Sequence, residues 1–257
     1  MQSLRNRLYG GKTLWGSWLQ CSSPAAAEVL ARIGYDWLAI DCEHTETTLN
    51  TATHMCRAGQ VLGAGMLMRV RTVEPLDIRQ ALDGGADGVI VPLVDTVEQA
   101  KTIVAAAKFP PLGHRGYSYV RANRWGIDFD EYAQTANDQT LVIVMIESAQ
   151  SVEAVGDILA VEGVDGAIIG PYDLSGSYGV PGQLDHELLV SAQERVLQAA
   201  HDTGKVSGTN LIMPTRDTID DAVQRGFRLI ALGGDTMYMT CPAREFLAYA
   251  RNRVSGS

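Results

Sequence analysis

The feature that most constrains the fold of this chain is a regular alternation of short apolar runs with helical patterns. The run LVIVMI, for example, is apolar at every position, which is typical of strands buried on both faces of a parallel sheet. Several helical patterns end in a glycine just before the next run, as expected for left-handed helix caps; these glycines are Gly34, Gly85, Gly204 and Gly226. Alternation of this kind predicts an α/β fold with a parallel sheet.

Eight such runs in 257 residues fit a single (β/α)₈ TIM barrel, which needs about 250 residues. A doubly wound open sheet is the structural alternative. The predicted strands are roughly Leu14–Leu19, Trp37–Asp41, Met66–Val70, Gly88–Pro92, Leu141–Ile146, Gly166–Ile169, Val206–Leu211 and Leu229–Leu232. The predicted helices include Pro24–Ile33, Ala100–Ala107, Val152–Leu159, Glu187–Ala200, Ile219–Gln224 and Ala243–Ala250.

One connection interrupts the alternation. Residues 109–139 contain GHRGYSYVRANRWG and a short helical pattern at Phe129–Ala136. Connections of this length are usually functional or lie at an interface. No repeat or linker indicates a second domain, so we predict one domain over residues 1–257 with a long inserted connection.

Charge and cysteine usage narrow the class of protein. The chain has 21 Lys and Arg against 30 Asp and Glu, a net charge of −9. This balance argues against nucleic acid or an anionic membrane surface as a partner, since both attract positive proteins. The four cysteines form no C-x-x-C pair, and no apolar run is long enough to span a bilayer. We therefore expect a cytoplasmic protein that acts on small molecules.

Polar residues follow the predicted strands at the end where a barrel places its active site. The second strand runs into Asp41-Cys42-Glu43-His44, and the first carries Trp18 and Gln20 near its end. Further polar residues at strand ends are Arg69, Glu147 and, after a Gly-Pro-Tyr turn, Asp173. We expect these side chains to converge on one face.

Glu147 and Asp173 follow adjacent strands and are candidates for a divalent metal site. Carboxylate oxygens with few other protein donors suit Mg²⁺ or Mn²⁺, which keep positions for water and substrate. Each acid also lies where a helix could begin, so the alternative is that both are helix caps.

His44 and Arg69 are candidates for the chemical steps. His44 could be a general base oriented by Asp41 or Glu43, or simply a polar loop histidine. Arg69 could hold a carboxylate or an enolate oxygen, or form a structural ion pair.

Two other classes of site receive less support. Gly233-Gly234-Asp235 follows the last strand, where barrels often bind phosphate, but an aspartate at a helix start repels anions and is better read as a cap. No G-x-G-x-x-G follows a strand, so no nicotinamide cofactor is indicated. No lysine ends a strand, which weakens a Schiff-base mechanism.

Several segments together resemble the HpcH/HpaI aldolase family, the class II pyruvate aldolases. The segments are AIDCEHTETTL, GADGVIVPLVDTVEQA, GHRGYSYVRANRWG, VMIESAQSVEAV, AIIGPYDLSGSYG and LGGDTMYM, and the resemblance runs from about Trp15 to Tyr238. It implies a barrel that reversibly cleaves 4-hydroxy-2-oxo acids to pyruvate and an aldehyde with a divalent metal, Mg²⁺ or Mn²⁺, with Co²⁺ as a further candidate.

The resemblance also implies roles for individual residues. Glu147 and Asp173 match the metal ligands, Arg69 the arginine at the keto oxygen, and His44 the base with Asp41 as its neighbouring acid. Residues matching the substrate pocket are Gly170, Tyr172 and Asp173, in a turn whose backbone amides hold the pyruvate carboxylate, and Trp18 and Leu211, which line the aldehyde side.

Asp83 matches an acid that reaches the base from an adjacent subunit, and the resemblance implies a homo-oligomer, a hexamer or trimer of dimers. Asp83 ends a helical pattern before the fourth strand, so it should lie at the opposite end of its own barrel from the site. The alternative is that Asp83 caps or pairs locally and that Arg115, Arg121 and Arg124 of the long connection form surface ion pairs.

Two positions depart from the family pattern. Met145 stands where the family often has Gln, and Tyr172 stands where a small residue is common. The resemblance therefore does not fix the substrate range. Two other functions remain as alternatives: a CoA-thioester lyase of the citramalyl- or malyl-CoA type, and a non-catalytic barrel that binds oxo acids. The absence of an evident basic patch for a CoA diphosphate weighs against the first.

Overall fold

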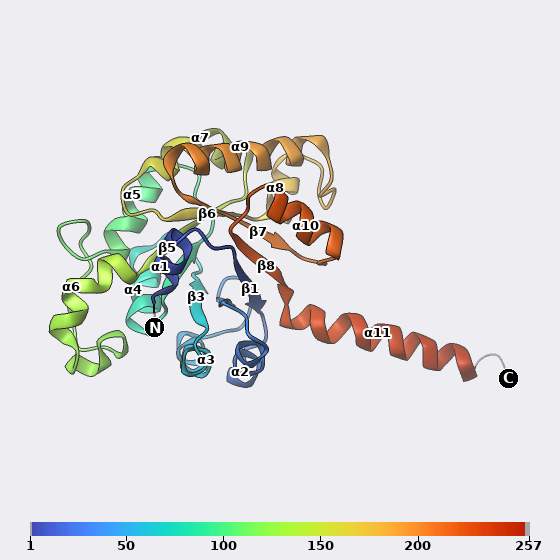
Figure 1. The fold of residues 1–257 in the computed structure, drawn as a ribbon, viewed down its shortest axis with the longest axis horizontal. Helices are drawn as coiled ribbons and strands as arrows, with labels where there is room; N and C mark the ends of the chain where they lie inside the picture. Colours follow the sequence, from blue (N-terminus) through green and yellow to red (C-terminus); the bar gives the residue numbers. More distant parts are fainter. Residues whose placement is uncertain (1, 255–257) are drawn as a thin grey trace.

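A computed structural model describes residues 2–254 as a closed barrel of eight parallel strands in sequence order, surrounded by helices (Figure 1). The predicted (β/α)₈ barrel is therefore confirmed, and the open-sheet alternative is excluded because β8 pairs with β1. The strands are β1 Leu14–Leu19, β2 Trp37–Asp41, β3 Gly65–Arg69, β4 Gly88–Val91, β5 Leu141–Ile146, β6 Gly166–Ile169, β7 Val206–Leu211 and β8 Leu229–Gly234.

The helices cover the outside of the barrel and close one of its ends. They are α1 Leu4–Tyr9, α2 Pro24–Ile33, α3 Leu49–Val61, α4 Pro75–Asp83, α5 Val97–Ala107, η1 Arg121–Gly126, α6 Phe129–Gln139, α7 Ala149–Ala160, α8 Pro171–Ser177, α9 Glu187–Thr203, α10 Arg216–Gln224 and α11 Asp235–Val254. The four glycines expected after helices all have a positive φ: Gly34, Gly85, Gly204 and Gly226. Their lack of a side chain lets the chain turn sharply into the next strand.

The apolar residues form two layers. One lies between the strands and the outer helices, and the other fills the barrel interior. Leu4 and Leu8 of α1 belong to the interior layer, so α1 closes the end of the barrel where the strands begin. Gly16 also faces the interior, because a Cβ there would meet the ring of Trp37 at 2.0 Å. The interior is thus a packed core that leaves only the opposite end free for a site.

Three aspartates link neighbouring strands by hydrogen bonds at the end of the barrel where the strands begin. Each stands just before an even-numbered strand and accepts a backbone N–H from the preceding odd-numbered one. The pairs are Asp36 with Trp15 at 2.9 Å, Asp87 with Met66 at 2.7 Å and Asp165 with Val142 at 2.9 Å. Fixing the register here also fixes which side chains point inward at the other end of each strand.

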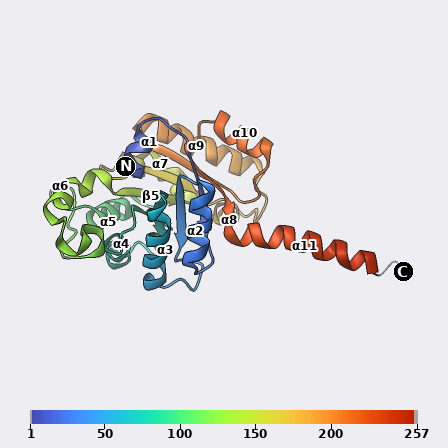
Figure 2. The ribbon, with the colours of Figure 1, turned by 60° about the horizontal axis from the view of Figure 1, so that its bottom comes forward.

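Two segments depart from the barrel pattern. The long connection between α5 and β5 holds η1 and α6. Helix α11 leaves the barrel after β8 and extends away from it, so that Pro242–Arg253 are exposed (Figures 1 and 2). Among residues 2–254, no helix combines the length and apolar character needed to cross a membrane.

Candidate active site

A cavity of 460 Å³ opens at the end of the barrel where the strands finish. Its walls carry most of the side chains that the sequence places at strand ends. The lining residues are Trp18, Gln20, Asp41, His44, Arg69, Met145, Ile169, Gly170, Pro171, Tyr172, Asp173, Asn210, Ile212, Met213, Gly233, Gly234 and Met237. Of the side chains expected to converge, Trp18, Gln20, Asp41, His44, Arg69 and Asp173 line this cavity, whereas Glu147 is buried and is not among the lining residues.

Asp41 and Arg69 form a buried pair at the ends of β2 and β3. Arg69 Nε donates to Asp41 Oδ1 at 3.0 Å and Nη2 donates to Oδ2 at 2.5 Å, the bidentate arrangement of strong ion pairs. The guanidinium also lies over the ring of Trp18, 4.8 Å from its centroid. Asp41 thus holds Arg69 in place, and Arg69 keeps Nη1 directed toward other groups of the cavity.

His44 contacts Glu43 and not Asp41. Its Nε2 lies 3.6 Å from Glu43 Oε2, while Asp41 Oδ1, besides the bond from Arg69, accepts the backbone N–H groups of Glu43 and His44, both at 3.1 Å. The His44 side chain is 58% exposed. Of the two acids proposed to orient the histidine, only Glu43 lies beside the ring. Asp41 instead holds the backbone of the loop that carries Glu43 and His44.

Glu147 follows β5 and is almost completely buried. Its Oε1 accepts the backbone N–H of Leu93 at 2.6 Å, and its Oε2 lies where a Cβ on Gly170 would approach to 2.8 Å. Burial raises the pKa of Glu147 to about 7, and the charges of Glu43 and Asp173 act in the same direction. Gly170 is needed here because any side chain would displace this carboxylate.

The donor set fits a divalent cation. Burial raises the pKa of Glu43 too, although Arg69 and His44 oppose the shift. Glu43 Oε2 lies 3.2 Å from Arg69 Nη1 as an ion pair but has no aligned hydrogen-bond donor. The negative charges of Glu43 and Asp173 act on Glu147, and a hard cation beside these carboxylates would oppose that repulsion. Among residues 2–254 no group of three or more His, Cys, Asp or Glu side chains is arranged to hold a metal ion.

Neither predicted metal ligand is used as a helix cap. Ser148 is the N-cap of α7 and accepts the N–H of Ser151, while Gly170 is the N-cap of α8. Asp173 lies in the first turn of α8 and is exposed at the cavity. The capping alternative for Glu147 and Asp173 therefore finds no support in the structure.

Asp235, in contrast, has the structural role expected of it. Its buried carboxylate accepts the backbone N–H groups of Gln20, Cys21 and Thr236 at 2.8–3.0 Å. It ties the start of α11 to the end of β1, and its negative charge at this helix start would repel a phosphate.

The turn into α8 offers backbone amides at the cavity wall. The N–H groups of Tyr172 and Asp173 lie in the first helical turn, where amides have no partner within the helix. The N–H of Gly170 instead donates to Ile146 at 3.1 Å, so Gly170 supplies space and not a donor. The Tyr172 side chain is 55% exposed at the rim of the cavity.

The far wall of the cavity differs from expectation at one position. Trp18 lines it as predicted, but Leu211 packs against the hydrophobic layer under the helices, and its neighbour Asn210 lines the cavity. Side chains alternate along a strand, so a shift of one residue exchanges the two faces. Met145, the departure noted in the sequence, is 3% exposed, with Sδ 3.9 Å from Arg69 Nη1.

Asp83 lies at the far end of α4 and is not among the residues that line this cavity. Its Oδ1 accepts a hydrogen bond from Arg115 Nη2 at 2.6 Å. Arg115 is fully buried and stacks against Phe109 at 4.7 Å, so it forms no surface ion pair, whereas Arg124 does pair with Asp128 at the surface. Within one chain, Asp83 therefore pairs locally, as the alternative reading expects.

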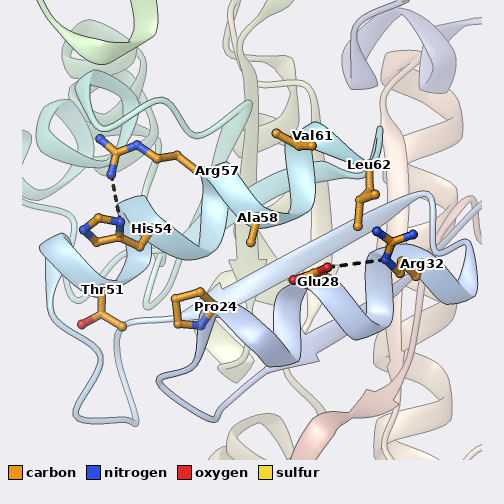
Figure 3. A pocket seen from close by; sticks show the side chains of 9 residues that line it. All are labelled: Pro24, Glu28, Arg32, Thr51, His54, Arg57, Ala58, Val61 and Leu62. Atoms are coloured by element: carbon orange, nitrogen blue, oxygen red, sulfur yellow. Dashed lines mark hydrogen bonds and ion pairs between the residues drawn. The ribbon is translucent and has the colours of Figure 1, made fainter.

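Two other hollows lie away from the strand ends. A groove of 650 Å³ runs between α2 and α3 on the outside of the barrel (Figure 3). Its polar side chains pair with each other, Glu28 with Arg32 and His54 with Arg57. A hollow of 1140 Å³ at the closed end is lined by Arg121, Arg124 and parts of α1. Neither contains the acidic cluster found at the strand ends.

Comparison with known proteins agrees with the motifs. The chain is 35% identical over 255 residues to 2-keto-3-deoxy-L-rhamnonate aldolase of Escherichia coli, covering 98% of this chain and 94% of that protein. A family protein from Burkholderia cenocepacia superposes with a TM-score of 0.91 at 36% identity, covering 98% and 100% of the two chains. The HpcH/HpaI aldolase of Desulfitobacterium hafniense gives 0.92 at 30% identity, covering 98% and 97%.

The expected enzyme class, an aldolase-type lyase acting on carbon–carbon bonds, is confirmed by these relatives. The profile of the family described as HpcH/HpaI aldolase/citrate lyase matches residues 14–242, nearly the whole barrel. The chain belongs to the HpcH/HpaI aldolase/citrate lyase family.

Proposed function

We propose that the cavity cleaves a 4-hydroxy-2-oxo acid reversibly to pyruvate and an aldehyde, with a divalent metal held by Glu147 and Asp173. The observation that carries the proposal is the buried Glu147 carboxylate, which belongs to an acidic cluster beside the fixed cation of Arg69. A dication bound there would supply Lewis-acid polarisation of the substrate ketone. We propose Mg²⁺ or Mn²⁺ for this position, because the donors are carboxylate oxygens; Co²⁺ is a further candidate.

Arg69 would stabilise the charge that develops on the keto oxygen as the carbon–carbon bond breaks. A fixed, mostly buried cation stabilises an oxyanion more strongly than water does. Asp41 keeps this cation in one orientation through two hydrogen bonds, and Trp18 covers one of its faces. The substrate carboxylate would accept hydrogen bonds from the free amides at the start of α8.

His44 would take the proton from the C4 hydroxyl in cleavage, directly or through a water, and return it in the aldol direction. Its exposed ring is at the mouth of the cavity, with Glu43 at 3.6 Å to orient it and to stabilise its protonated form. We propose that Asp41 positions Arg69 and that Glu43 orients the His44 ring.

The test is pyruvate release, followed with lactate dehydrogenase, from hydroxy-oxo acids of different chain length. 2-Keto-3-deoxy-L-rhamnonate is the first compound to try because a relative is named for its cleavage. We expect activity that EDTA abolishes and that Mn²⁺, Mg²⁺ or Co²⁺ restores to different extents. Release of pyruvate that EDTA does not affect, or cleavage of a CoA thioester but of no free acid, would overturn the proposal.

We further propose that the active site is shared between chains of a homo-oligomer. Asp83 lies at the opposite end of its barrel from His44, yet it matches a position that completes the site in the family. The Arg115 contact would then orient Asp83, whose side chain remains 27% exposed, toward a neighbouring subunit. Mixing an Asp83→Ala chain with a His44→Ala chain should restore part of the activity that each lacks alone. Mixed oligomers that stay inactive would refute shared sites.

The chain's four cysteines are unpaired, which is compatible with the reducing cytoplasm that we propose as its location.

A further inference from the structure

The loop after β4 contains a leucine with an unusual backbone conformation. Leu93 has a φ of 56°, in the left-handed region that residues other than glycine rarely adopt. Among residues 2–254 the other two such residues, Arg124 and Trp125, both lie in the long connection. The Leu93 side chain is 55% exposed, although its neighbours Pro92 and Val94 are buried. An exposed apolar side chain on a strained backbone indicates that the backbone, and not the side chain, has a task here.

The amide of Leu93 holds one oxygen of Glu147. Its N–H donates to Glu147 Oε1 at 2.6 Å, a short hydrogen bond of the kind that a carboxylate accepts. The other oxygen, Oε2, lies on the side of Gly170, where a Cβ would approach it to 2.8 Å. Gly170 lines the active-site cavity. The hydrogen bond to Oε1 therefore fixes the carboxylate with Oε2 toward the cavity wall.

A second hydrogen bond joins the same loop to the segment after β5. Ser148 Oγ donates to Asp95 Oδ1. Asp95 is itself held, because its backbone N–H donates to the side chain of Gln99 in the first turn of α5 at 2.8 Å. Val94 belongs to the apolar layer between the strands and the outer helices. The loop is thus anchored on both sides of Leu93, which keeps the amide of Leu93 at Glu147.

We propose that Leu93 is a positioning residue of the metal site: its left-handed backbone holds Glu147 Oε1, so that Oε2 is the oxygen presented to the cation. The inference rests on the proposed function, because it concerns a metal ligand assigned there. Groups that hydrogen-bond to a metal ligand orient it, and their loss weakens metal binding. The backbone strain at Leu93 is therefore part of the site, and the surrounding loop maintains it.

The experiment measures the affinity for Mn²⁺ without substrate, from the electron paramagnetic resonance signal of the free ion. Leu93→Ile keeps the size and apolar character of the side chain, but a β-branched residue fits the left-handed region poorly. It should turn the amide away from Glu147 and weaken Mn²⁺ binding about tenfold. Leu93→Gly removes the side chain but adopts a positive φ readily, so its affinity should stay within about threefold of the wild type. A packing role of the leucine side chain would give the opposite order.

Asp95 provides a second test that does not depend on the folding of the Leu93 variants. Asp95→Ala and Asp95→Asn both remove the charge, but only Asp95→Asn keeps an acceptor for Ser148 Oγ. Mn²⁺ should bind about threefold more weakly to Asp95→Ala than to Asp95→Asn.

Two results would overturn the inference and leave the aldolase proposal intact. One is an unchanged Mn²⁺ affinity in a folded Leu93→Ile, or a loss in Leu93→Gly as large as in Leu93→Ile. The other, which decides if Leu93→Ile does not fold, is an equal affinity of the two Asp95 variants. A wild type that binds no Mn²⁺ would overturn both the inference and the aldolase proposal.

Discussion

At the scale of single residues, the burial of Glu147 couples the site to protons. A metal ligand must be deprotonated, and burial raises the pKa of Glu147 to about 7. Protons and metal should therefore compete in the neutral range. We predict that the affinity for Mn²⁺ falls about tenfold from pH 8 to pH 6, since one proton must leave per metal bound.

Isothermal titration of Mn²⁺ at pH 6, 7 and 8, in buffers of different ionisation enthalpy, measures both the affinity and the proton release. Near pH 7 we expect about half a proton released for each metal bound. Glu147→Gln should lose the binding, and Glu98, an exposed acid that does not line the cavity, changed to Gln should behave as the wild type. A constant affinity from pH 6 to pH 8 would contradict this role of Glu147.

The contacts of Arg69 predict that its positive charge alone does not support full activity. Three of its contacts need a planar guanidinium: the two bonds to Asp41 and the stacking over Trp18. Lysine keeps the charge but makes neither the fork nor the stack. Arg69→Lys should lower kcat/KM for pyruvate release by about 10²- to 10³-fold. Circular dichroism and the melting temperature should confirm that the variant is folded, and near-normal turnover would show that position and planarity are unimportant.

Single residues also mark how far the sequence could predict the site. Asp41, Arg69 and Glu147 end buried strands, so their convergence follows from the barrel alone. Leu211 and Asn210 are adjacent on β7, and only the register of the strand decides which faces the cavity.

At the scale of elements, the strands were the most predictable part. β1, β2, β5, β6 and β7 begin and end as predicted. Every residue of β2, β5 and β6 is buried, so the apolar run of each has sharp limits, whereas β1 and β7 are partly exposed. Helix α11 was predicted only over Ala243–Ala250 but runs over Asp235–Val254. Pro242 lies inside it, and proline normally ends or kinks a helix, so the pattern indicated a later start.

One buried lysine joins α5 to the start of β5. Lys108 follows α5, and its Nζ donates to the carbonyls of Asn137 at 2.8 Å and Thr140 at 2.7 Å. Lys108→Met should therefore destabilise the protein by about 2 kcal/mol at pH 7, because two buried carbonyls lose their donor. Urea unfolding measures the effect, and Lys101→Met, whose side chain is 64% exposed, is the matched control.

The same lysine predicts a pH dependence of stability. Burial lowers the pKa of Lys108 from 10.5 to about 8. Between these values the unfolded chain binds more protons than the folded one, so the contribution of Lys108 to stability rises with pH. The free energy of unfolding of the wild type, relative to Lys108→Met, should increase by about 2 kcal/mol from pH 8 to pH 9.5. If the difference in unfolding free energy between the two proteins did not change with pH, burial would not lower the pKa of Lys108.

At the scale of the whole molecule, the two ends of the barrel have different tasks. The strand ends carry the cavity, while the other end is closed by α1 and bordered by Asp83 and the long connection. Helix α11 belongs to neither end: it contacts β1 and β8 near its start and then leaves the barrel (Figure 2). A barrel that shares its site between chains needs contacts that hold the chains together, and α11 is the element best placed to make them.

The last prediction concerns this helix. Phe246, Leu247 and Tyr249 of α11 are 72%, 51% and 59% exposed, and a helical segment of this length is only marginally stable in water without packing. We therefore expect α11 to pack on another copy of the chain and to stabilise the oligomer. A chain ending at Cys241 should keep its folded barrel, since Pro242–Arg253 are exposed, but should show a lower mass in size-exclusion chromatography with light scattering.

Phe246→Glu combined with Leu247→Glu should also lower the mass, and Glu245→Gln on the same helix should leave the mass unchanged. If Asp83 completes a neighbouring site, the shortened chain should also lose activity on dilution. A monomeric wild type, or a shortened chain of unchanged assembly, would rule out this role for α11.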